Sequence, residues 1–527
     1  MERSFSTQAS AHPDLTLPAD SLIKRWKIGA VLVIVIAVIV NAILGNVLFT
    51  LFGWVSITMY GLVVIARKII QIYLAISSNR SRRLTVRRPL VEEFARQYPH
   101  LADRAYALLR QNQPYEAFKT AFLQLLEDAH DEYELQSLEE SPAPGRSDTL
   151  PWLYNSVWVQ RKWEQIMSSS FPYMPYVGLV IPTYRTSKLE LQRLVESLEN
   201  QTYPHLWVSI VLNENSEELK SFTHKLIRKY GGGKYIRFVE PRKGKRNAMR
   251  MGFADFLDDP QVKYVFNVDS DSKLHPDAIA NAVRLFESDP DIGCLTGDIH
   301  VANTDVNLLT RLTAQRFFYA FNVERAAQNR FDAVTCMSGA FMAVRARVLR
   351  EILNPWANQR FLGQACNFGD DRHISTLVLE RGLKSVYCPD SISLTDVPHE
   401  MPMWKRQQTR WARSAWRETL ITLPWLHRLP LWIVFEVAYL LVFPFILWGI
   451  LIALGYRAVI YGPQVLLPYF VVVIALNFIF NAFYGIVVNR DFRYLLGPLY
   501  LFYQFVYLQP LRLWALISLD ITRWGTK

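Results

Sequence analysis

The sequence predicts an α/β domain with a parallel, doubly wound sheet, inserted between apolar helices at the two ends of the chain. Two observations predict this fold class. Short apolar runs rich in β-branched residues alternate with helical patterns from residue 176 onward, as in parallel sheets with helical crossovers. The apolar residues, 51% of a 527-residue chain, are in excess near both ends, in stretches long enough to cross a bilayer.

An apolar stretch near the N-terminus, residues 28–66, predicts a transmembrane hairpin. It is almost free of strongly polar side chains, and it is longer than the roughly 20 residues that one span requires. We expect two helices near 28–48 and 51–76, with a turn at Leu44-Gly45-Asn46. A cleaved signal peptide is the alternative, but its apolar core is shorter and a cleavage site should follow it.

Basic residues flank this hairpin on both sides. By the positive-inside rule, both flanks and the middle of the chain face the cytoplasm, which predicts a multi-pass protein of the plasma (inner) membrane. The net charge of +11 then needs no nucleic acid as a partner, because juxtamembrane cations can face the anionic headgroups of a lipid bilayer. The flanking cations are Lys24, Arg25 and Lys27 before the hairpin, and Arg80, Arg82, Arg83, Arg87 and Arg88 after it.

Three further apolar stretches near the C-terminus predict membrane helices. Leu431–Tyr456, Val465–Val488 and Leu495–Leu519 are each long enough to span, and the short basic loop at 489–493 should lie on the cytoplasmic side. The side on which the chain ends stays open. Glu436 lies inside the first of these helices, where a carboxylate is unfavourable in lipid. It either lines a translocation path or forms a hydrogen bond between helices.

The chain divides into six parts on these patterns. Residues 89–139 carry amphipathic helical patterning without candidate chemistry, and Ser141–Asp148 is typical of a linker. The four cysteines have no metal-type spacing and are predicted to be free thiols. The predicted parts are a flexible N-terminus (1–23), the transmembrane hairpin (24–77), a helical segment with a linker (78–150), the α/β domain (151–400), interface helices (401–428) and C-terminal transmembrane helices (429–527).

The stretch Val265–Asp271 carries the first candidate site. Its apolar run predicts a buried strand, and two acids, Asp269 and Asp271, follow where the strand ends. Ligands bind at the carboxyl ends of strands in open α/β sheets, where two carboxylates can converge on one hard cation. Mg²⁺ or Mn²⁺ held in this way keeps open positions for phosphates, which indicates a nucleotide-diphosphate substrate. A solvated Asp-Ser-Asp turn is the alternative.

The strands before this site end in polar residues. The first predicted strand, 176–184, leads into a helix at 189–198, and the second, 207–212, ends in Asn213-Glu214-Asn215. A compact basic loop, Pro241–Arg246, then leads into another helix. Its Lys245 and Arg246 fit contact with a uridine or its diphosphate, and a solvated charge run is the alternative.

Two glycine-containing pairs follow the predicted strand. Gly297-Asp298 comes after another apolar segment. Ser338-Gly339 marks a place where the backbone passes close to another group, for which a substrate sugar is a candidate. The helical stretch between the two pairs, Gln315–Arg325, is also explained by plain core packing.

Adjacent acids, Asp370 and Asp371, come before a predicted helix start, where the helix macrodipole favours carboxylates. One of them can be a general base that deprotonates an acceptor hydroxyl. N-capping by Asp370 is the alternative. His373 is interpreted as a helix-surface or core histidine rather than a metal ligand.

The last cluster, Gln407-Gln-Thr-Arg-Trp411, lies on an amphipathic segment rich in tryptophan and basic residues. Arg410 can pair with a departing diphosphate and stabilise charge that grows in the transition state. Trp411 offers a flat apolar face on which a pyranose ring can sit. An interfacial helix at the membrane surface explains the same composition, and both roles can hold at once.

The order Asp-x-Asp, Gly-Asp, Gly-Asp-Asp and Gln-x-x-Arg-Trp between membrane helices resembles the processive, inverting glycosyltransferases of family two, which include cellulose, chitin and hyaluronan synthases. Within that group the chain is most similar to hyaluronan synthases. That similarity is carried by Ala320–Ala326, Phe361–His373 and Gln407–Trp411. The resemblance extends over roughly residues 175–420 and the flanking helices.

The resemblance implies an α/β fold of the GT-A (nucleotide-diphospho-sugar transferase) type, in the cytoplasm between N- and C-terminal transmembrane helices, with amphipathic interface helices. It implies UDP-sugar donors, Mg²⁺ or Mn²⁺ as cofactor, and a growing polysaccharide that leaves through the membrane helices. The implied residues are Asp269 and Asp271 for UDP and metal, Lys245, Arg246 and Glu214 for the nucleotide, Asp371 with its neighbour Asp370 as base, Arg410 for the diphosphate, and Asp298, Ser338, Gly339, Cys366, Gln407 and Trp411 for the donor and acceptor sugars.

Two departures from the family pattern bear on the donor sugars. Family members usually carry an Asp pair where this chain has Asn213-Glu214, and hyaluronan synthases typically have Ser-Gly-Pro-Leu where it has Ser338-Gly-Ala-Phe341. The leading hypothesis is a synthase that alternates UDP-GlcNAc and UDP-GlcA. A synthase of chitin oligosaccharide, or of another capsule or exopolysaccharide, is the nearest rival, and a non-catalytic membrane scaffold is a different class.

Overall fold

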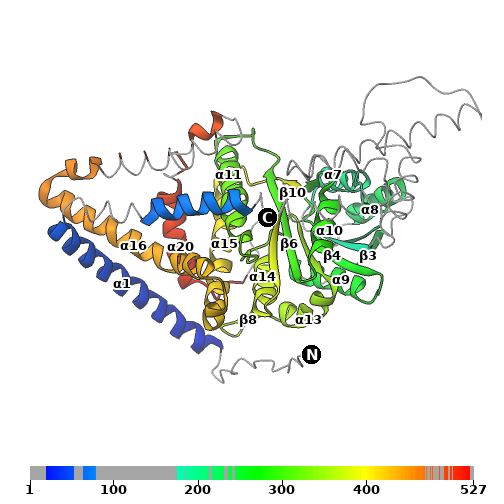
Figure 1. The fold of residues 1–527 in the computed structure, drawn as a ribbon, viewed down its shortest axis with the longest axis horizontal. Helices are drawn as coiled ribbons and strands as arrows, with labels where there is room; N and C mark the ends of the chain where they lie inside the picture. The colour runs from blue at the N-terminus through cyan, green and yellow to red at the C-terminus, as the bar shows by residue number, and fades with distance from the viewer. Residues whose placement is uncertain are drawn as a thin grey trace, which may run out of the picture.

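The structure, a computed structural model, describes the α/β region almost continuously and the apolar regions in part (Figure 1). The described residues are 19–52, 63–78, 175–183, 186–203, 205–212, 217–230, 236–239 and 244–468, with short pieces from 471 onward that include 492–496 and 503–522. The predicted segment 78–150 therefore lies almost wholly outside the described residues.

An eight-stranded sheet forms the centre of the α/β region, in the order β3-β2-β1-β4-β7-β6-β10-β5. The half β3-β2-β1-β4 is parallel, as predicted. The prediction of a wholly parallel sheet is wrong, because β7 runs antiparallel between β4 and β6, and β5 runs antiparallel to β10. The strands are β1 (Tyr176–Thr183), β2 (Leu206–Leu212), β3 (Ile236–Val239), β4 (Val262–Asn267), β5 (Ser272–Leu274), β6 (Ile292–Val301), β7 (Met342–Arg345) and β10 (Lys384–Thr395).

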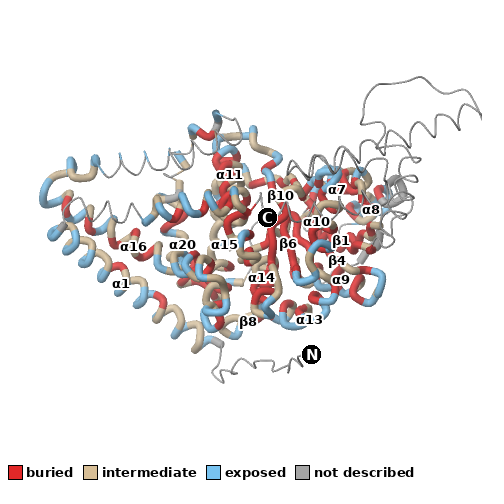
Figure 2. The backbone as a smooth tube through the Cα atoms, in the orientation of Figure 1, coloured by how far each residue is buried: buried red, intermediate tan, exposed pale blue. Residues whose placement is uncertain are grey.

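Helices cover both faces of this sheet, because its strands are apolar on both sides. In β1, Leu179 and Ile181 belong to one core and Val180 to the other. Figure 2 shows the buried residues concentrated in the central strands. The first core packs α7 (Lys188–Glu199), α8 (Glu217–Tyr230) and α10 (Ala278–Ser288), and the second packs α9 (Lys245–Leu257), α13 (Ala346–Ala357) and α14 (Asp370–Glu380).

Two long apolar helices extend from the side of the α/β region on which α15 (Met401–Thr422) lies (Figure 1). Within the described residues, α1 (Ala19–Phe52) and α16 (Leu431–Tyr461) are the helices long and apolar enough to cross a membrane. The predicted turn at Leu44-Gly45-Asn46 is wrong, because α1 runs through it. A single glycine inside a helix costs only about 1 kcal/mol relative to alanine, and Gly45 packs beside Ala453 of α16.

The other predicted membrane helices are described only in part. Residues 63–78 are helical, in agreement with the predicted second helix of the hairpin. The stretch Val465–Val488 lies mostly outside the described residues. In Leu495–Leu519, a π-helix at Gln504–Leu508 continues into α20 (Gln509–Ile517), and the described apolar helix there is shorter than a membrane span.

Glu436 of α16 is buried in an ion pair with the helix at 63–78. Its carboxylate accepts hydrogen bonds from Arg67 Nε at 2.9 Å and Nη2 at 2.6 Å, and from Gln71 Nε2 at 3.0 Å. The Arg67 guanidinium also lies 4.1 Å from the ring centroid of Tyr439. Of the two interpretations of Glu436, the hydrogen bond between helices is confirmed.

We expect Arg67→Met to destabilise the protein by about 3–5 kcal/mol, because it leaves the Glu436 carboxylate buried without its counter-ion. The double variant Arg67→Met/Glu436→Leu should recover most of this loss, since an apolar pair has no charge to desolvate. Thermal unfolding of detergent-purified protein measures both. Lys27→Met is the control, because the Lys27–Asp520 pair is partly exposed. An equal loss of unfolding free energy in the single and double variants would contradict the role of Arg67 as the counter-ion of Glu436.

Candidate active site

One of the two acids after β4, Asp269, contacts the first turn of α9. Lys245, the first residue of α9, forms an ion pair with Asp269. Burial opposes the charge on Lys245, but the interaction with Asp269 outweighs it and the pKa of Lys245 is raised. Asp271 accepts a hydrogen bond from Thr395 Oγ1 at 3.2 Å, at the end of β10. The two predicted metal ligands thus lie at the carboxyl end of β4, as predicted.

The backbone of Gly339 passes through the centre of this site. Its N–H donates to Asp371 Oδ2 at 3.2 Å, and its carbonyl accepts from Asn267 Nδ2 at 2.9 Å. A Cβ atom at Gly339 would lie 3.2 Å from Asp269 Oδ2 and 3.3 Å from Lys245 Nζ. A side chain at residue 339 would therefore be in tight contact with Asp269 and Lys245, whose side chains would have to move by a few tenths of an ångström. The expectation that the backbone passes close to another group at Ser338-Gly339 is confirmed, although the neighbouring group is the protein itself.

The two acids at the start of α14 have different environments. Asp371 accepts from the N–H of Arg372 at 2.8 Å as well as from Gly339, and burial raises the pKa of its carboxyl. Asp370 is not the N-cap residue as the alternative interpretation had it, because Gly369 occupies that position with a φ of 83°. Asp371 is the acid suited to act as a general base, because a raised pKa makes a carboxylate a stronger base.

Asp370 forms a buried ion pair with Arg246, the second residue of α9. Arg246 Nε donates to Asp370 Oδ1 at 2.5 Å, and its Nη1 donates to Gln359 Oε1 at 2.9 Å and to the Trp356 carbonyl at 3.2 Å. Both ion-pair partners are only 5% exposed. The Arg246 guanidinium, predicted to contact a nucleotide, thus points into the protein and fixes Asp370.

α15 brings Arg410 to the same site and carries Trp411 as the next residue. Burial lowers the pKa of Arg410, and the charges of Asp371, Asp269 and Asp370 oppose that shift, in that order, so the guanidinium lies within electrostatic reach of all three acids. Trp411 is 41% exposed, with its ring centroid 6.2 Å from that of Phe317. The predicted cluster therefore places a cation near the acids, and the next residue along α15 has a partly exposed aromatic ring.

Four other predicted residues surround these groups less directly. Asp298 is bonded to His300 Nε2 at 2.8 Å and lies within reach of Asn322, and Ser338 N–H donates to Thr296 Oγ1 at 3.1 Å. Gln407 is half-buried, and its Oε1 has no hydrogen-bond partner among the described residues. Cys366 is only 3% exposed, so its side chain does not present an open surface to an acceptor sugar. Glu214 lies outside the described residues.

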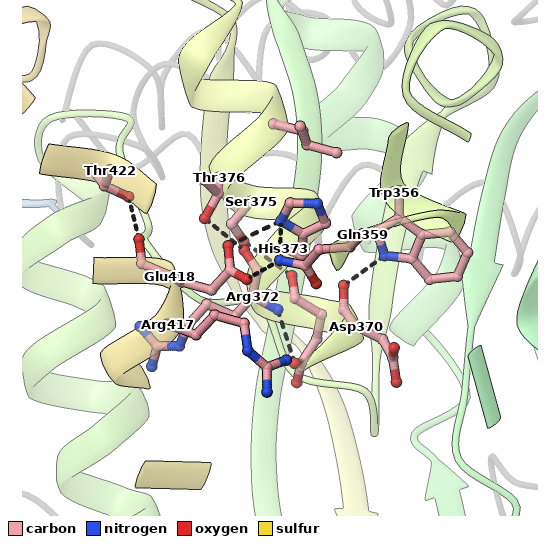
Figure 3. A network of polar contacts seen from close by, with 12 residues as sticks. Trp356, Gln359, Asp370, Arg372, His373, Ser375, Thr376, Arg417, Glu418 and Thr422 are labelled. Atoms are coloured by element: carbon pink, nitrogen blue, oxygen red, sulfur yellow. Dashed lines mark hydrogen bonds and ion pairs between the residues drawn. The ribbon is translucent and has the colours of Figure 1, made fainter. Parts of the chain in front are cut away.

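A buried polar network behind Asp370 contains residues that the sequence motifs did not mark (Figure 3). His373 Nδ1 lies 2.9 Å from Glu418 Oε2 and 3.1 Å from Gln359 Nε2, and Gln359 donates to Glu418 Oε1 at 2.6 Å. Burial raises the pKa of the Glu418 carboxyl, but His373, Gln359 and Arg417 outweigh burial and bring it to about 2. His373 is a core histidine, which is one of the two positions predicted for it. The four cysteines, Cys294, Cys336, Cys366 and Cys388, are free thiols.

The described residues contain no group of three or more His, Cys, Asp or Glu side chains that could hold a metal ion. Asp269 and Asp271 nevertheless supply the right chemistry for a hard cation, since Mg²⁺ is typically bound through one or two carboxylates together with substrate phosphates. The donor set at the end of β4 therefore fits a divalent cation bound together with a diphosphate.

Comparison with known proteins identifies the family. Residues 175–414 match the family model described as "Glycosyltransferase like family 2". Hyaluronan synthase 3 of Xenopus laevis is 31% identical over 382 residues, which cover 66% of this chain and 68% of that protein. The chain belongs to the hyaluronan synthase family of glycosyltransferases. Hyaluronan synthase 2 of Bos taurus is 29% identical, over 69% of this chain and 72% of its own length.

This hyaluronan synthase-like glycosyltransferase also aligns with solved structures. Mannosyltransferase PcManGT from Pyrobaculum calidifontis, solved with GDP-Man and Mn²⁺, aligns over 72% of this chain and 95% of its own, with 19% identity and a TM-score of 0.47. That likeness is too small to carry an argument about the reaction. The family assignment rests on the sequence relatives.

Asp370→Asn should lower the free energy of unfolding by about 3 kcal/mol or more, because it removes the counter-ion of the buried Arg246 guanidinium. Asp371→Asn should leave it unchanged or raise it slightly, because burial already disfavours the charged form of Asp371. Thermal unfolding followed by tryptophan fluorescence compares the two. Equal destabilisation by both substitutions would contradict the assignment of a buried ion pair to Asp370 and of a destabilised charge to Asp371.

Proposed function

We propose that this glycosyltransferase is a processive, inverting polysaccharide synthase that uses UDP-GlcNAc and UDP-GlcA and extrudes a β-linked polymer through the membrane. The observation that supports the reaction most is the meeting of Lys245, Asp269 and Asp371 around the backbone of Gly339, with Arg410 within electrostatic reach of the acids. The relatives at about 30% identity support the choice of donors.

In this proposal Asp371 is the general base. Its carboxylate takes the proton of the acceptor hydroxyl, and the oxygen of that hydroxyl attacks the anomeric carbon of the donor sugar from the face opposite to UDP. One glycosidic C–O bond forms, the C–O bond to the diphosphate breaks, and the configuration is inverted. The proton ends on Asp371 and the electron pair leaves with UDP. Arg410, within electrostatic reach of Asp371, stabilises the charge that grows on the diphosphate.

Asp269 and Asp271 would hold the Mg²⁺ or Mn²⁺ that the donor diphosphate brings into contact with them. When bound, that cation neutralises phosphate charge and so makes UDP a better leaving group. Lys245 holds Asp269 in place and supplies a further positive charge at the same point. Glu214 stays a proposed nucleotide ligand, and Asp298 and Ser338 remain proposed ligands of the sugars.

The acceptor sugar is proposed to stack on Trp411, whose exposed face lies one residue from Arg410. A pyranose ring presents C–H groups that pack on an aromatic face. Gln407 lies one turn before Trp411 on α15, but its unpartnered Oε1 is buried, so its proposed role toward the acceptor sugar requires that the atom become accessible. Cys366 takes no direct part here, because it is buried.

The apolar helices are proposed to cross the membrane, with the α/β domain and the active site in the cytoplasm. Their large apolar side chains are widely exposed, with Leu51 68% exposed and Val459 86% exposed. Surfaces of this kind are stable in lipid rather than in water. The growing polymer would then pass from Trp411 between these helices.

Purified protein in detergent, supplied with Mn²⁺, tests the choice of donors. We expect polymer only when UDP-GlcNAc and UDP-GlcA are both present, and we expect hyaluronidase to degrade it. Chelation of the divalent cation with EDTA should stop synthesis and Mn²⁺ should restore it. Polymer made from one sugar nucleotide alone would instead support a homopolymer such as chitin oligosaccharide.

Asp371→Asn should lower kcat by about 10²–10⁴-fold, which is the usual contribution of general base catalysis. It should leave the Kd for UDP within about threefold, because Asp371 does not hold the nucleotide in this mechanism. Because burial raises the pKa of Asp371 above the ordinary value of 3.8, the wild-type rate should fall on acidification at a higher pH than an ordinary aspartate would give. Near-normal polymer output from Asp371→Asn would remove this assignment of the base.

A further inference from the structure

The second half of α15 is fitted to the start of α14 by a set of buried contacts, which we call the α14–α15 clamp (Figure 3). Its members are Gln359, Phe368, Gly369, His373, Ser414, Arg417 and Glu418. The proposed mechanism uses none of these residues. They lie directly behind Asp370 and Asp371, and they join two helices that each carry a group of the active site.

Glu418 forms the centre of the clamp. It is 3% exposed, and each of its carboxylate oxygens has its own partner, Gln359 for Oε1 and His373 for Oε2. Gln359 is also bonded to Arg246, which holds Asp370. An unbroken chain of polar contacts therefore runs from α15 through Glu418 to the first residue of α14.

The loop before α14 adds two more contacts. Arg417 is 1% exposed, donates through Nη1 to the Phe368 carbonyl at 3.2 Å, and lies 4.8 Å from the centroid of the Phe368 ring. A Cβ atom at Gly369 would come within 2.3 Å of Ser414 Oγ. The loop can approach α15 this closely only because residue 369 is a glycine.

Helix geometry connects the clamp to the reacting groups. Trp411 and Glu418 are seven residues apart, as are Arg410 and Arg417, so each pair is separated by about two turns and lies on one face of α15. The clamp residues contact α14 and the loop before it, Arg410 lies within electrostatic reach of the acids, and Trp411 is the proposed platform for the acceptor. A shift or rotation of α15 at Glu418 is therefore transmitted to Arg410 and Trp411.

We propose that Glu418 is a positioning residue that keeps α15 in register with α14, so that the Trp411 platform and Arg410 stay aligned with Asp371 and donor cleavage stays coupled to transfer onto the polymer. This inference rests on the proposed function. It makes no claim that Glu418 touches a substrate. Loss of register should let water replace a misplaced acceptor hydroxyl, which releases free sugar and UDP.

The ratio of free sugar released to sugar incorporated into polymer tests this proposal, because misfolded protein lowers both rates equally and leaves the ratio unchanged. We expect Glu418→Ala to raise the ratio at least tenfold and to shorten the polymer, in line with the roughly 10–100-fold effects of residues that orient a functional group. Glu418→Gln, which keeps the shape and one acceptor oxygen, should give an intermediate ratio. The Kd for UDP should stay within about threefold.

Glu287→Gln and Glu287→Ala are the controls, because they make the same substitutions at a hydrogen-bonded glutamate outside the clamp. Glu287 accepts a hydrogen bond from Tyr264 on the other face of the sheet, so its loss should leave the ratio at the wild-type value. If Glu418→Ala does not fold, Glu418→Gln decides alone. A ratio within twofold of the wild-type ratio in Glu418→Gln would then overturn the positioning role. The proposed function would still stand in that case, provided that the wild-type protein makes polymer. Absence of transfer by the wild type itself would overturn both.

Discussion

The buried ion pair between Arg246 and Asp370 is the interaction on which the rest of the site depends. Asp370 and Asp371 are neighbours, and two carboxylates this close disfavour each other's charge. Arg246 neutralises Asp370 inside the protein, which leaves Asp371 with backbone donors from Gly339 and Arg372 as its partners. The same first turn of α9 places Lys245 on Asp269. One helix start thus fixes acids from two distant parts of the chain.

Two cations in the first turn of a helix are unfavourable by themselves, because the helix dipole favours anions at that end. The N-cap of α9 is Gly244, which provides no side-chain cap. The carboxylates of Asp269 and Asp370 offset the charges of the two cations by pairing with Lys245 and Arg246. This arrangement makes the start of α9 a place where negative charge is stabilising, and the diphosphate of a sugar nucleotide carries such charge. The positive charge at the start of α9 therefore agrees with the assignment to a family of glycosyltransferases.

The sequence predicted the elements whose signal is local. The strand before Asp269 and the helix at 188–199 follow from apolar periodicity and helix signals. The antiparallel strand β7 was not predicted, because a strand of four residues is too short to show a pattern of alternating apolar and polar residues. Arg246 was assigned to the nucleotide because a basic loop does not show which cation will find a carboxylate 124 residues later. Glu418 and Gln359 pair across 59 residues, and no motif marks either of them.

α15 belongs to the active site and to the apolar helices at the same time. Trp416 Nε1 donates to the Arg512 carbonyl at 2.9 Å and Arg413 Nε to Ser518 Oγ at 3.0 Å, which bind α15 to α20 and the turn after it. Trp26 of α1 donates to the Leu516 carbonyl of the same segment at 2.9 Å. The helix that carries Arg410 and Trp411 is thus held on one side by α14 and on the other by α20, which also binds α1. Because α15 is fixed from both sides, its movement would have to break buried polar contacts. On the proposed function, these contacts on both sides of α15 hold Arg410 and Trp411 in place relative to Asp371.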